Sequence, residues 1–268
     1  MIDPDIAIAG WRPLAGGDSA RCFAVEVAGR KIVVKLGDLS TPTALPVADE
    51  FRLLEHASSI GVAPRPIGVD SKAGILLSEL VESLPWAPGE FHEIDNVERL
   101  GRRLRMMHTI PTGIRPYEPI AFAKLYVESC DVRDRAQAEA WASELGERAQ
   151  RLSDDPSEVV TCHNDLHSSN VLQTAELMFI DFEYAVTAPP IVDIASAIAM
   201  NRFDERQRDA LVSAYYGDDV APFDRDALAN AVRMHDLVAE LWRLSVAAQR
   251  QRVGHQNEIN AWESVAHE

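Results

Sequence analysis

Short runs of apolar residues in the first third of the chain follow the pattern of β-strands. Residues 22–36 contain two such runs separated by Ala28-Gly29-Arg30, a spacing typical of a β-hairpin. Residues 74–81 form a third run, which predicts a buried strand that continues into a connector. Between them, apolar side chains recur at helical spacing over residues 46–60, and Gly61 stands where a helix would end. We therefore expect a small sheet with one helix at the N-terminal end.

Helical spacing of apolar residues dominates the chain after residue 91. Helices are predicted over residues 97–108, 122–129, 136–152, 204–216 and 227–252. One stretch interrupts them, because residues 159–184 contain short β-type runs separated by polar residues. The pattern predicts an α+β fold with a small N-terminal antiparallel sheet plus helix and a larger, mostly helical C-terminal lobe. We place the two lobes at residues 1–84 and 85–268.

The composition is that of an ordinary globular protein. The chain has 268 residues, of which 47% are hydrophobic and 25% charged. This length exceeds the usual size of a single core and suits two lobes. No apolar run approaches the length of a bilayer span, and the N-terminus carries acids where a signal peptide needs basic residues. We expect a soluble, cytoplasmic protein without a membrane partner.

Cysteine usage and net charge exclude several kinds of site and partner. Cys22, Cys130 and Cys162 are too few and too scattered for a disulfide framework or a zinc cage, so we interpret them as small core residues. A formal net charge of −16 argues against nucleic acid as a partner, because the two would repel each other. The charge would attract a cationic substrate, but acidic surfaces also serve solubility alone, so the substrate stays open.

Three polar residues follow short apolar runs within residues 162–184. Asp165 and Asn170 are separated by four residues, and Asp181 directly follows an apolar run. Phosphoryl transfer needs an acceptor for the proton of the nucleophile and hard oxygen ligands that hold Mg²⁺ against a triphosphate. The spacing predicts Asp165 as catalytic base and Asn170 with Asp181 as ligands of Mg²⁺. Each residue alone could equally shape a turn, but the three in this order favour a phosphotransferase.

The sequences HNDLHSSN and FIDFEYA resemble the catalytic core of the choline kinase and aminoglycoside phosphotransferase superfamily. The HxDxxxxN motif of that superfamily falls on His163, Asp165 and Asn170, and its second metal-binding Asp falls on Asp181. The form Asp-x-Glu-Tyr resembles the choline, ethanolamine and thiamine kinase branches. The resemblance implies a bilobal protein-kinase-like fold, ATP and Mg²⁺ as cofactors, and a small-molecule hydroxyl acceptor. We interpret His163 as a residue that holds the loop by hydrogen bonding and His167 as solvated.

The similarity extends to the N-terminal region. LAGGDSARCF, residues 14–23, resembles the loop that covers the phosphates, which assigns Gly16, Gly17 and Ser19 to nucleotide binding. Glycines there let backbone N–H groups approach an anion, although an ordinary turn before a strand would use the same residues. IVVKL places Lys35 at the position of the lysine that binds the nucleotide phosphates.

Glu50 is the expected partner of Lys35. Leu53 and Leu54 lie three and four residues beyond it on the same face of the predicted helix, so its carboxylate points toward the apolar stripe. A charge in that place needs a partner. A Lys–Glu pair orients the lysine onto the α- and β-phosphates in kinases. The alternative is a peripheral, solvated Glu50.

The connector between the lobes is expected to bind the base of the nucleotide. SELVE, residues 78–82, resembles the segment whose backbone hydrogen-bonds adenine in kinase-like proteins. Glu79 and Val81 occupy the expected positions. Backbone N–H and C=O groups make these hydrogen bonds, so the identity of the side chains says little about which residues bind adenine.

The acceptor site is expected in the helical lobe. In choline kinases it includes aromatic residues that hold a quaternary ammonium group by cation–π attraction. The resemblance points to Trp242 in residues 237–249, with Glu183 and Tyr184 as further candidates. Trp242 could instead be a packing residue of an amphipathic helix.

One departure from choline kinases bears on the acceptor. Those enzymes carry an acid about two turns after the position of Asp193, where this chain has Met200 and Asn201. A carboxylate that binds the substrate would then be missing, which keeps thiamine, another amino alcohol or a sugar possible. Asp193 itself resembles the structural Asp that caps a helix and braces the catalytic loop.

Three functions are consistent with the sequence. The favoured one is an ATP-dependent kinase that moves the γ-phosphate to a hydroxyl of a small cationic metabolite, as choline, ethanolamine and thiamine kinases do. The second is an aminoglycoside phosphotransferase, and the third is a non-catalytic nucleotide-binding protein with a kinase fold. The presence together of Lys35, Asp165, Asn170 and Asp181 favours an enzyme. A monomer and a homodimer both agree with the sequence.

Overall fold

The computed structural model describes residues 8–14, 20–37, 43–152, 159–217 and 224–266. The chain forms two compact units: residues 1–116 with 158–223, and residues 117–157 with 224–268. The lobes expected at residues 1–84 and 85–268 differ from these two units, and the boundary at residue 84 stays a proposal. Gly16, Gly17 and Ser19 lie outside the described residues, so their assignment also stays a prediction.

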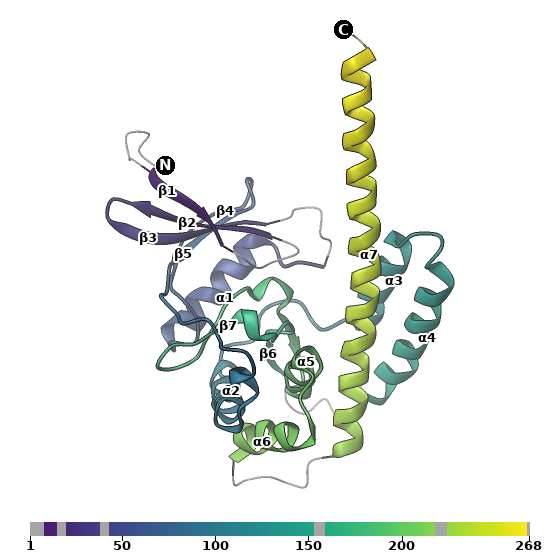
Figure 1. The fold of residues 1–268 in the computed structure, drawn as a ribbon. Helices are drawn as coiled ribbons and strands as arrows, with labels where there is room; N and C mark the ends of the chain where they lie inside the picture. The colour runs from purple at the N-terminus through teal and green to yellow at the C-terminus, as the bar shows by residue number, and fades with distance from the viewer. Residues whose placement is uncertain (1–7, 15–19, 38–42, 153–158, 218–223, 267–268) are drawn as a thin grey trace. The chain divides into compact units, whose positions relative to one another are not determined.

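The first unit begins with a five-stranded antiparallel sheet in the order β1-β2-β3-β5-β4 (Figure 1). Its strands are β1 (Ile8–Pro13), β2 (Ala20–Val27), β3 (Arg30–Gly37), β4 (Pro66–Asp70) and β5 (Ile75–Glu79). β2 and β3 confirm the predicted hairpin. Ala28 and Gly29 form its turn with positive φ angles of 51° and 76°, which match the twist of the flanking strands. β3 lies in the middle of the sheet and carries Lys35.

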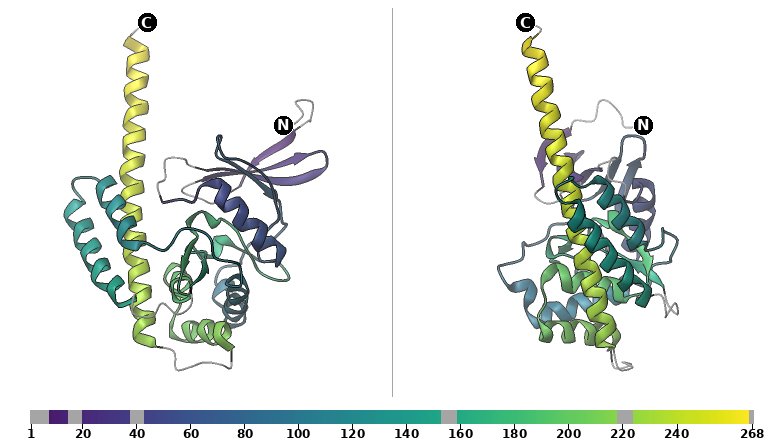
Figure 2. Two further views of the ribbon diagram at one scale, coloured as in Figure 1. Left: turned by 180° about the vertical axis from the view of Figure 1, so that it is seen from behind. Right: turned by 90° about the vertical axis from the view of Figure 1, so that its right-hand side faces the viewer.

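Helix α1 (Val47–Ser59) lies against one face of this sheet, as both Figure 1 and Figure 2 show. Its apolar stripe, with Leu53, Leu54 and Ala57, is buried. The helix ends at Ser59, and Gly61 two residues later has a φ of 72° and donates its N–H to the carbonyl of Ser58. The predicted helix is therefore confirmed to within a residue at each end.

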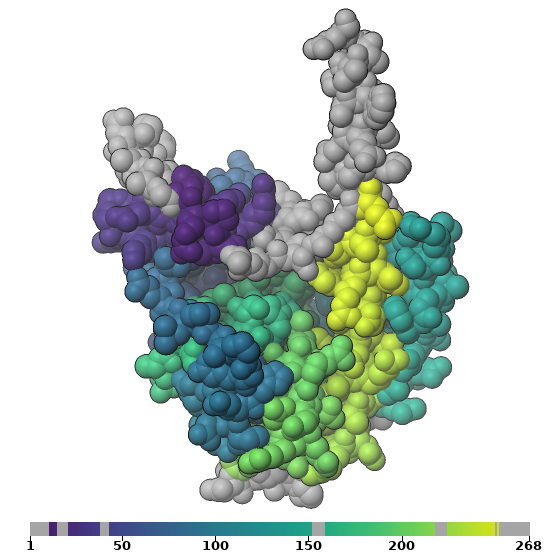
Figure 3. All heavy atoms as spheres, viewed as in Figure 1, coloured from purple at the N-terminus to yellow at the C-terminus, as the bar shows by residue number. Residues whose placement is uncertain are grey.

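The remainder of the first unit combines helices with short strands. Its helices are α2 (Ile94–Met107), α5 (Ile191–Asn201) and α6 (Glu205–Tyr216), with 3₁₀ turns η1 (Glu90–His92), η2 (Ser168–Asn170) and η3 (Phe182–Tyr184). Two antiparallel pairs join β6 (Val160–Cys162) to β9 (Val186–Ala188) and β7 (Val171–Leu172) to β8 (Met178–Phe179). Figure 3 shows strands β1 to β3 in purple, α2 in blue, and the segment that holds these pairs in green between those strands and α6.

Packing in this part of the unit is tight. A Cβ atom on Gly101 of α2 would lie 2.6 Å from the carbonyl oxygen of Leu211 on α6, so only glycine fits that crossing. α5 is buried over nearly its whole length. The resemblance implied a helix at Asp193, but the hydrophobic pattern did not predict α5, because a helix buried on all sides shows no periodicity.

The second unit is a helical bundle of α3 (Pro119–Ser129), α4 (Arg135–Leu152) and α7 (Arg225–Ala266), in which α3 and α4 lie beside α7 (Figure 2). Tyr126, Leu145 and Leu237 belong to its apolar core. Across the bundle, Arg233 of α7 donates two hydrogen bonds to the carboxylate of Glu144 on α4. The three predicted helices are confirmed, and α7 extends well past the expected end at residue 252.

Two further expectations concern membranes and cysteines. Over the described ranges, none of the helices has both the length and the apolar character that crossing a bilayer requires.

Cys130 and Cys162 are buried, as core residues should be. Cys22 is only half-buried and lines a cavity, so the interpretation as a core residue was wrong there.

Candidate active site

Lys35 contacts three carboxylates. Its Nζ atom lies 2.8 Å from Glu50 Oε1, 2.5 Å from Asp181 Oδ1 and 2.9 Å from Glu183 Oε2. Lys35 and Glu50 expose only 7% and 1% of their surface, so the predicted ion pair forms and is buried. Both acids of the Asp-x-Glu-Tyr sequence join this pair. The lysine thus connects the centre of the sheet to the segment after β8.

Burial and charge together set the protonation of this cluster. Burial alone would lower the pKa of Lys35, but Glu50, Asp181 and Glu183 hold that pKa well above its usual value. Burial raises the pKa of Glu50, whereas at Asp181 the neighbouring Lys35 outweighs burial and keeps the pKa below its usual value. Lys35 is therefore a cation and Asp181 an anion at neutral pH. A single ammonium group among three carboxyl groups leaves excess negative charge, which suits a further cation.

The backbone presents Asp181 in an unusual conformation. Asp181 has φ 68° and ψ 62°, the left-handed region that residues other than glycine seldom adopt. The preceding carbonyl, that of Ile180, accepts a hydrogen bond from His163 Nε2 at 2.9 Å, and the His163 ring packs on Phe182 with centroids 4.5 Å apart. His163 is fully buried. Its geometry agrees with a residue that holds the loop.

Asp165 and Asn170 meet in the loop between β6 and β7. Asn170 Nδ2 donates to both the carbonyl oxygen and Oδ2 of Asp165, each at 2.9 Å. Because the amide nitrogen makes both bonds, Oδ1 of Asn170 remains to bind a hard cation. A neutral amide oxygen and the ionised carboxylate of Asp181 are the donor types that Mg²⁺ prefers, so the residues present fit that metal.

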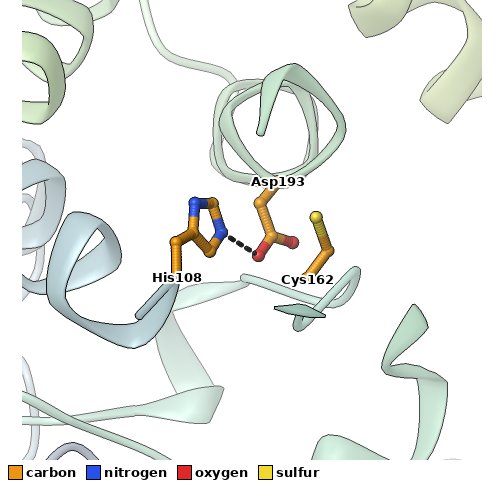
Figure 4. Close-up of side chains that lie close together, drawn as sticks. All are labelled: His108, Cys162 and Asp193. Carbon is orange, nitrogen blue, oxygen red and sulfur yellow. Dashed lines mark hydrogen bonds and ion pairs between the residues drawn. The ribbon is translucent and has the colours of Figure 1, made fainter. Parts of the chain in front are cut away.

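Helix α5 holds this loop through buried polar side chains. Asp193 accepts hydrogen bonds from the backbone N–H groups of His163 and Asn164 at 2.7 and 2.6 Å. His108 contacts the same carboxylate at 3.0 Å (Figure 4). Cys162 lies close enough to His108 and Asp193 for the three to share a metal, but the Asp193 oxygens are already occupied by these donors. The structure therefore agrees with a bracing role for Asp193.

A cavity of about 1060 Å³ brings most of the predicted nucleotide-binding and metal-binding residues together. Six of them line it: Lys35, Glu50, Glu79, Val81, Asn170 and Asp181. The backbone N–H of Val81 has no hydrogen-bond partner in the described part of the chain, so it can serve a ligand. Ala24, Leu54 and Leu76 supply apolar wall. Polar groups converge in an otherwise partly apolar cavity, which is the usual form of a ligand site.

Sequence reasoning missed two features of this site. His167, interpreted as solvated, lines the cavity, and its Nε2 atom lies 3.6 Å from Oδ2 of Asp165. Glu183, assigned to the acceptor, is buried against Lys35. Both acids, Asp181 and Glu183, are visible in the Asp-x-Glu sequence. Their shared contact with Lys35, almost 150 residues earlier, leaves no pattern in the neighbouring residues from which it could be predicted.

The other acceptor candidates lie in different units. Tyr184 follows Glu183 in η3 and is half-buried. Trp242 belongs to α7 of the second unit, where it is partly buried against the bundle core. Contact of either residue with an acceptor stays a prediction.

A five-stranded sheet with one helix, a helical second part, and a buried Lys–Glu pair beside an Asp/Asn/Asp cluster define a kinase-like phosphotransferase. The model of the phosphotransferase enzyme family (APH) matches residues 10–231. The chain belongs to this family. The resemblance and the fold class expected from the sequence are both confirmed.

Individual relatives agree with this membership. "Probable choline kinase 1" of Arabidopsis thaliana is 24% identical over 178 residues, a match that covers 62% of this chain and 51% of that protein, about half its length. A choline/ethanolamine kinase family protein from Mesorhizobium loti has a TM-score of 0.74 at 21% identity, covering 91% of this chain and 82% of the other. LicA in complex with AMP has a TM-score of 0.79 at 20% identity, covering 92% and 87%. At these identities the structures establish the fold.

Proposed function

We propose that this phosphotransferase moves the γ-phosphoryl group of ATP to a hydroxyl of a small cationic alcohol of the choline, ethanolamine or thiamine class. The observation that carries the proposal is the single cavity in which Lys35, paired with Glu50, faces Asn170 and Asp181. These are the groups that phosphoryl transfer needs for phosphate and metal binding.

The nucleotide is bound by groups from the sheet and the connector. Lys35, held by Glu50, contacts the α- and β-phosphates, and Val81 with Glu79 offers backbone groups to adenine. Gly16, Gly17 and Ser19 cover the phosphates in this proposal. The occurrence of AMP in the similar LicA structure supports nucleotide binding.

Asn170 Oδ1 and the Asp181 carboxylate hold Mg²⁺ in this proposal. When bound, Mg²⁺ neutralises charge on the phosphates. The electrostatics of the cluster support this assignment, because Lys35 alone leaves negative charge uncompensated. The Lys35 contact also keeps Asp181 ionised, and so able to bind a cation.

Asp165 is the base for the acceptor. As the hydroxyl oxygen of the acceptor forms its bond to the γ-phosphorus, the bond from that phosphorus to the bridging oxygen of ADP breaks. The hydroxyl proton passes to the Asp165 carboxylate and is later released to solvent. Asp165 must be ionised to do so.

The class of acceptor is supported by charge and by the relatives. A net charge of −16 favours a cation, and the named relatives include a probable choline kinase and a choline/ethanolamine kinase family protein. Tyr184, next to Glu183 in η3, is the aromatic side chain of the first unit that would contact an ammonium group, and Trp242 remains a candidate from the resemblance alone. The absence of an acid at Met200 keeps several amino alcohols in the class.

ADP release by the purified protein with Mg-ATP tests the proposal. The acceptors are choline, ethanolamine, thiamine, aminoglycosides and simple sugars, with Asp165→Ala as control. Turnover with one amino alcohol that Asp165→Ala abolishes is the expected result. Turnover confined to an aminoglycoside would replace the amino alcohol, and ATP binding without turnover on the whole panel would favour a non-catalytic nucleotide-binding protein.

A further inference from the structure

The two carboxylate oxygens of Asp165 have different contacts. Oδ2 accepts the hydrogen bond from Asn170 Nδ2 at 2.9 Å and lies 3.6 Å from His167 Nε2. The second distance is in the range of an ion pair and is longer than a hydrogen bond. Within the ranges that the structure describes, no residue makes a hydrogen bond or ion pair with Oδ1. One hydrogen bond and one longer contact thus fall on Oδ2, and Oδ1 is left to react.

The position of His167 is fixed by its neighbours in the chain. Asn201, buried at the end of α5, donates to the carbonyl of Leu166 at 2.7 Å and accepts from the N–H of Ser168 at 2.9 Å. The carbonyl of His167 itself accepts the N–H of Asn170 at 2.9 Å. The backbone on both sides of His167 is therefore held, and a side chain on it has a defined place beside Asp165.

We propose that His167 is a positioning residue for the catalytic base: together with Asn170 it holds Oδ2 of Asp165, so that Oδ1 accepts the proton of the acceptor hydroxyl. This inference rests on the proposed function and deepens it. A carboxylate held at one oxygen keeps its other oxygen in a reactive orientation, which is the effect that catalysis needs from a base.

The hydrogen-bonding capacity of the ring agrees with this geometry. Nε2 of the imidazole ring can donate its N–H toward Oδ2 of Asp165 across the 3.6 Å that separates the two atoms. The His167 side chain is one-third exposed, so solvent weakens but does not abolish the attraction.

Two substitutions at His167 test the proposal. His167→Leu removes the donor, whereas His167→Gln keeps an amide N–H near the place of Nε2 without a titratable ring. The assay is ADP release with the acceptor that gives the highest turnover on the panel above, and slow hydrolysis of Mg-ATP alone is the probe without acceptor. We expect His167→Leu to lower kcat about tenfold to a hundredfold, with KM for ATP within about twofold of wild type. His167→Gln should recover most of kcat.

The matched control is His56→Leu, the same substitution at an exposed position of α1. It should leave kcat, KM and the melting temperature as in wild type. Three results would overturn the proposal: wild-type kcat in His167→Leu, a rise in KM for ATP at unchanged kcat, or equal losses in His167→Leu and His167→Gln together with a lower melting temperature.

Failure of the two proposals can be told apart. If wild type shows turnover that Asp165→Ala abolishes, the proposed function stands, and the His167 variants alone decide the positioning role. If wild type shows no turnover with any acceptor and no hydrolysis of ATP, the proposed function is wrong and the inference falls with it.

Discussion

At the scale of single residues, Lys35 joins three carboxylates, those of Glu50, Asp181 and Glu183, in one largely buried cluster. Removing one partner of a buried ion pair leaves charge unpaired in a medium that solvates it poorly. In the proposed function the same lysine has two tasks, because it compensates the carboxylates without nucleotide and would bind phosphate with nucleotide.

Lys35→Met should lower the free energy of unfolding by about 3 kcal/mol at neutral pH, since two buried carboxyl groups and the partly buried one of Asp181 lose their cation. Chemical denaturation measures this change. Lys31→Met is the matched control, because Lys31 lies on the same strand and its ion pair with Glu82 is exposed. A loss no larger than that of the control would contradict the account of the cluster.

The deficit of Lys35→Met should shrink in acid. Lys35 depresses the pKa of Asp181, so in wild type this contribution to stability is present above the unfolded pKa of the carboxyl group and is lost as the pH falls through the folded value. The variant lacks the contribution at every pH. The gap between the denaturation curves of the two proteins should therefore stay constant from pH 7 to about pH 5 and close only as the pH falls below about 4, where the Asp181 carboxylate takes up its proton. A gap that persists or grows below about pH 4 would show that charge is not the cause.

At the scale of elements, α5 acts as a scaffold for the catalytic loop. Asp193 at its first turn holds the backbone of His163 and Asn164, Ser196 accepts from the N–H of Leu166, and Asn201 holds the residues that flank His167. The apolar sides of α5 are buried, so these polar groups are fixed in place by packing. The loop takes its shape from the helix.

Asn201→Leu tests this scaffold. The substitution keeps side-chain bulk and leaves the N–H of Ser168 and the carbonyl of Leu166 unpaired, which should cost about 3 kcal/mol in unfolding free energy. We expect kcat to fall more than about tenfold while ATP affinity, measured by calorimetry, stays within about twofold. Ser213→Ala, on an exposed turn of α6, is the control. An unchanged kcat would mean that the loop keeps its shape without α5.

An ion pair between α4 and α7 stabilises the bundle of the second unit. Arg233 and Arg148 donate hydrogen bonds to Glu144, and the hydrogen bond from Arg233 is the largest cause that lowers the Glu144 pKa to about 2. This contribution to stability is present above the unfolded value and is lost as the pH falls through about 2. Partial exposure keeps the effect modest.

Glu144→Gln should therefore lower the melting temperature at neutral pH, and the gap to wild type should narrow as the pH falls below the usual carboxyl pKa. Glu147→Gln, exposed on the same helix, should cost little at either pH. A gap that does not depend on pH would indicate lost packing in place of lost charge.

At the scale of the whole molecule, the sequence predicted the elements whose pattern is local. The β2–β3 hairpin, α1 and the helices of the second unit follow from alternation, helical spacing and turn residues. The sequence also predicts roles for Asp165, Asn170 and Asp181, because phosphoryl transfer demands those side chains at those spacings, and these roles stay a prediction. The Lys35–Glu50 pair could be inferred because a charge on an apolar helix face needs a partner.

Other features could not be predicted because they depend on contacts distant in sequence. α5 lacks periodicity since all its sides are buried, and the edge strands β1 and β4 are short and partly exposed. The neighbouring residues give no reason to interpret His167 as anything but a solvated side chain. Its backbone is held by Asn201, which lies more than thirty residues away in the sequence. Such positions become visible only when the chain is folded.

The central claim is that Asp165 is the base in transfer of the γ-phosphoryl group to an alcohol. The most direct measurement is the rate at which the phosphorylated acceptor forms from Mg-ATP, for wild type, Asp165→Asn and the exposed control Asp95→Asn, together with ATP affinity. We predict product with wild type and the control, and a kcat about a hundredfold to ten-thousandfold lower in Asp165→Asn at nearly unchanged ATP affinity. Equal rates in Asp165→Asn and wild type, or an equally large loss of ATP binding, would contradict this role for Asp165.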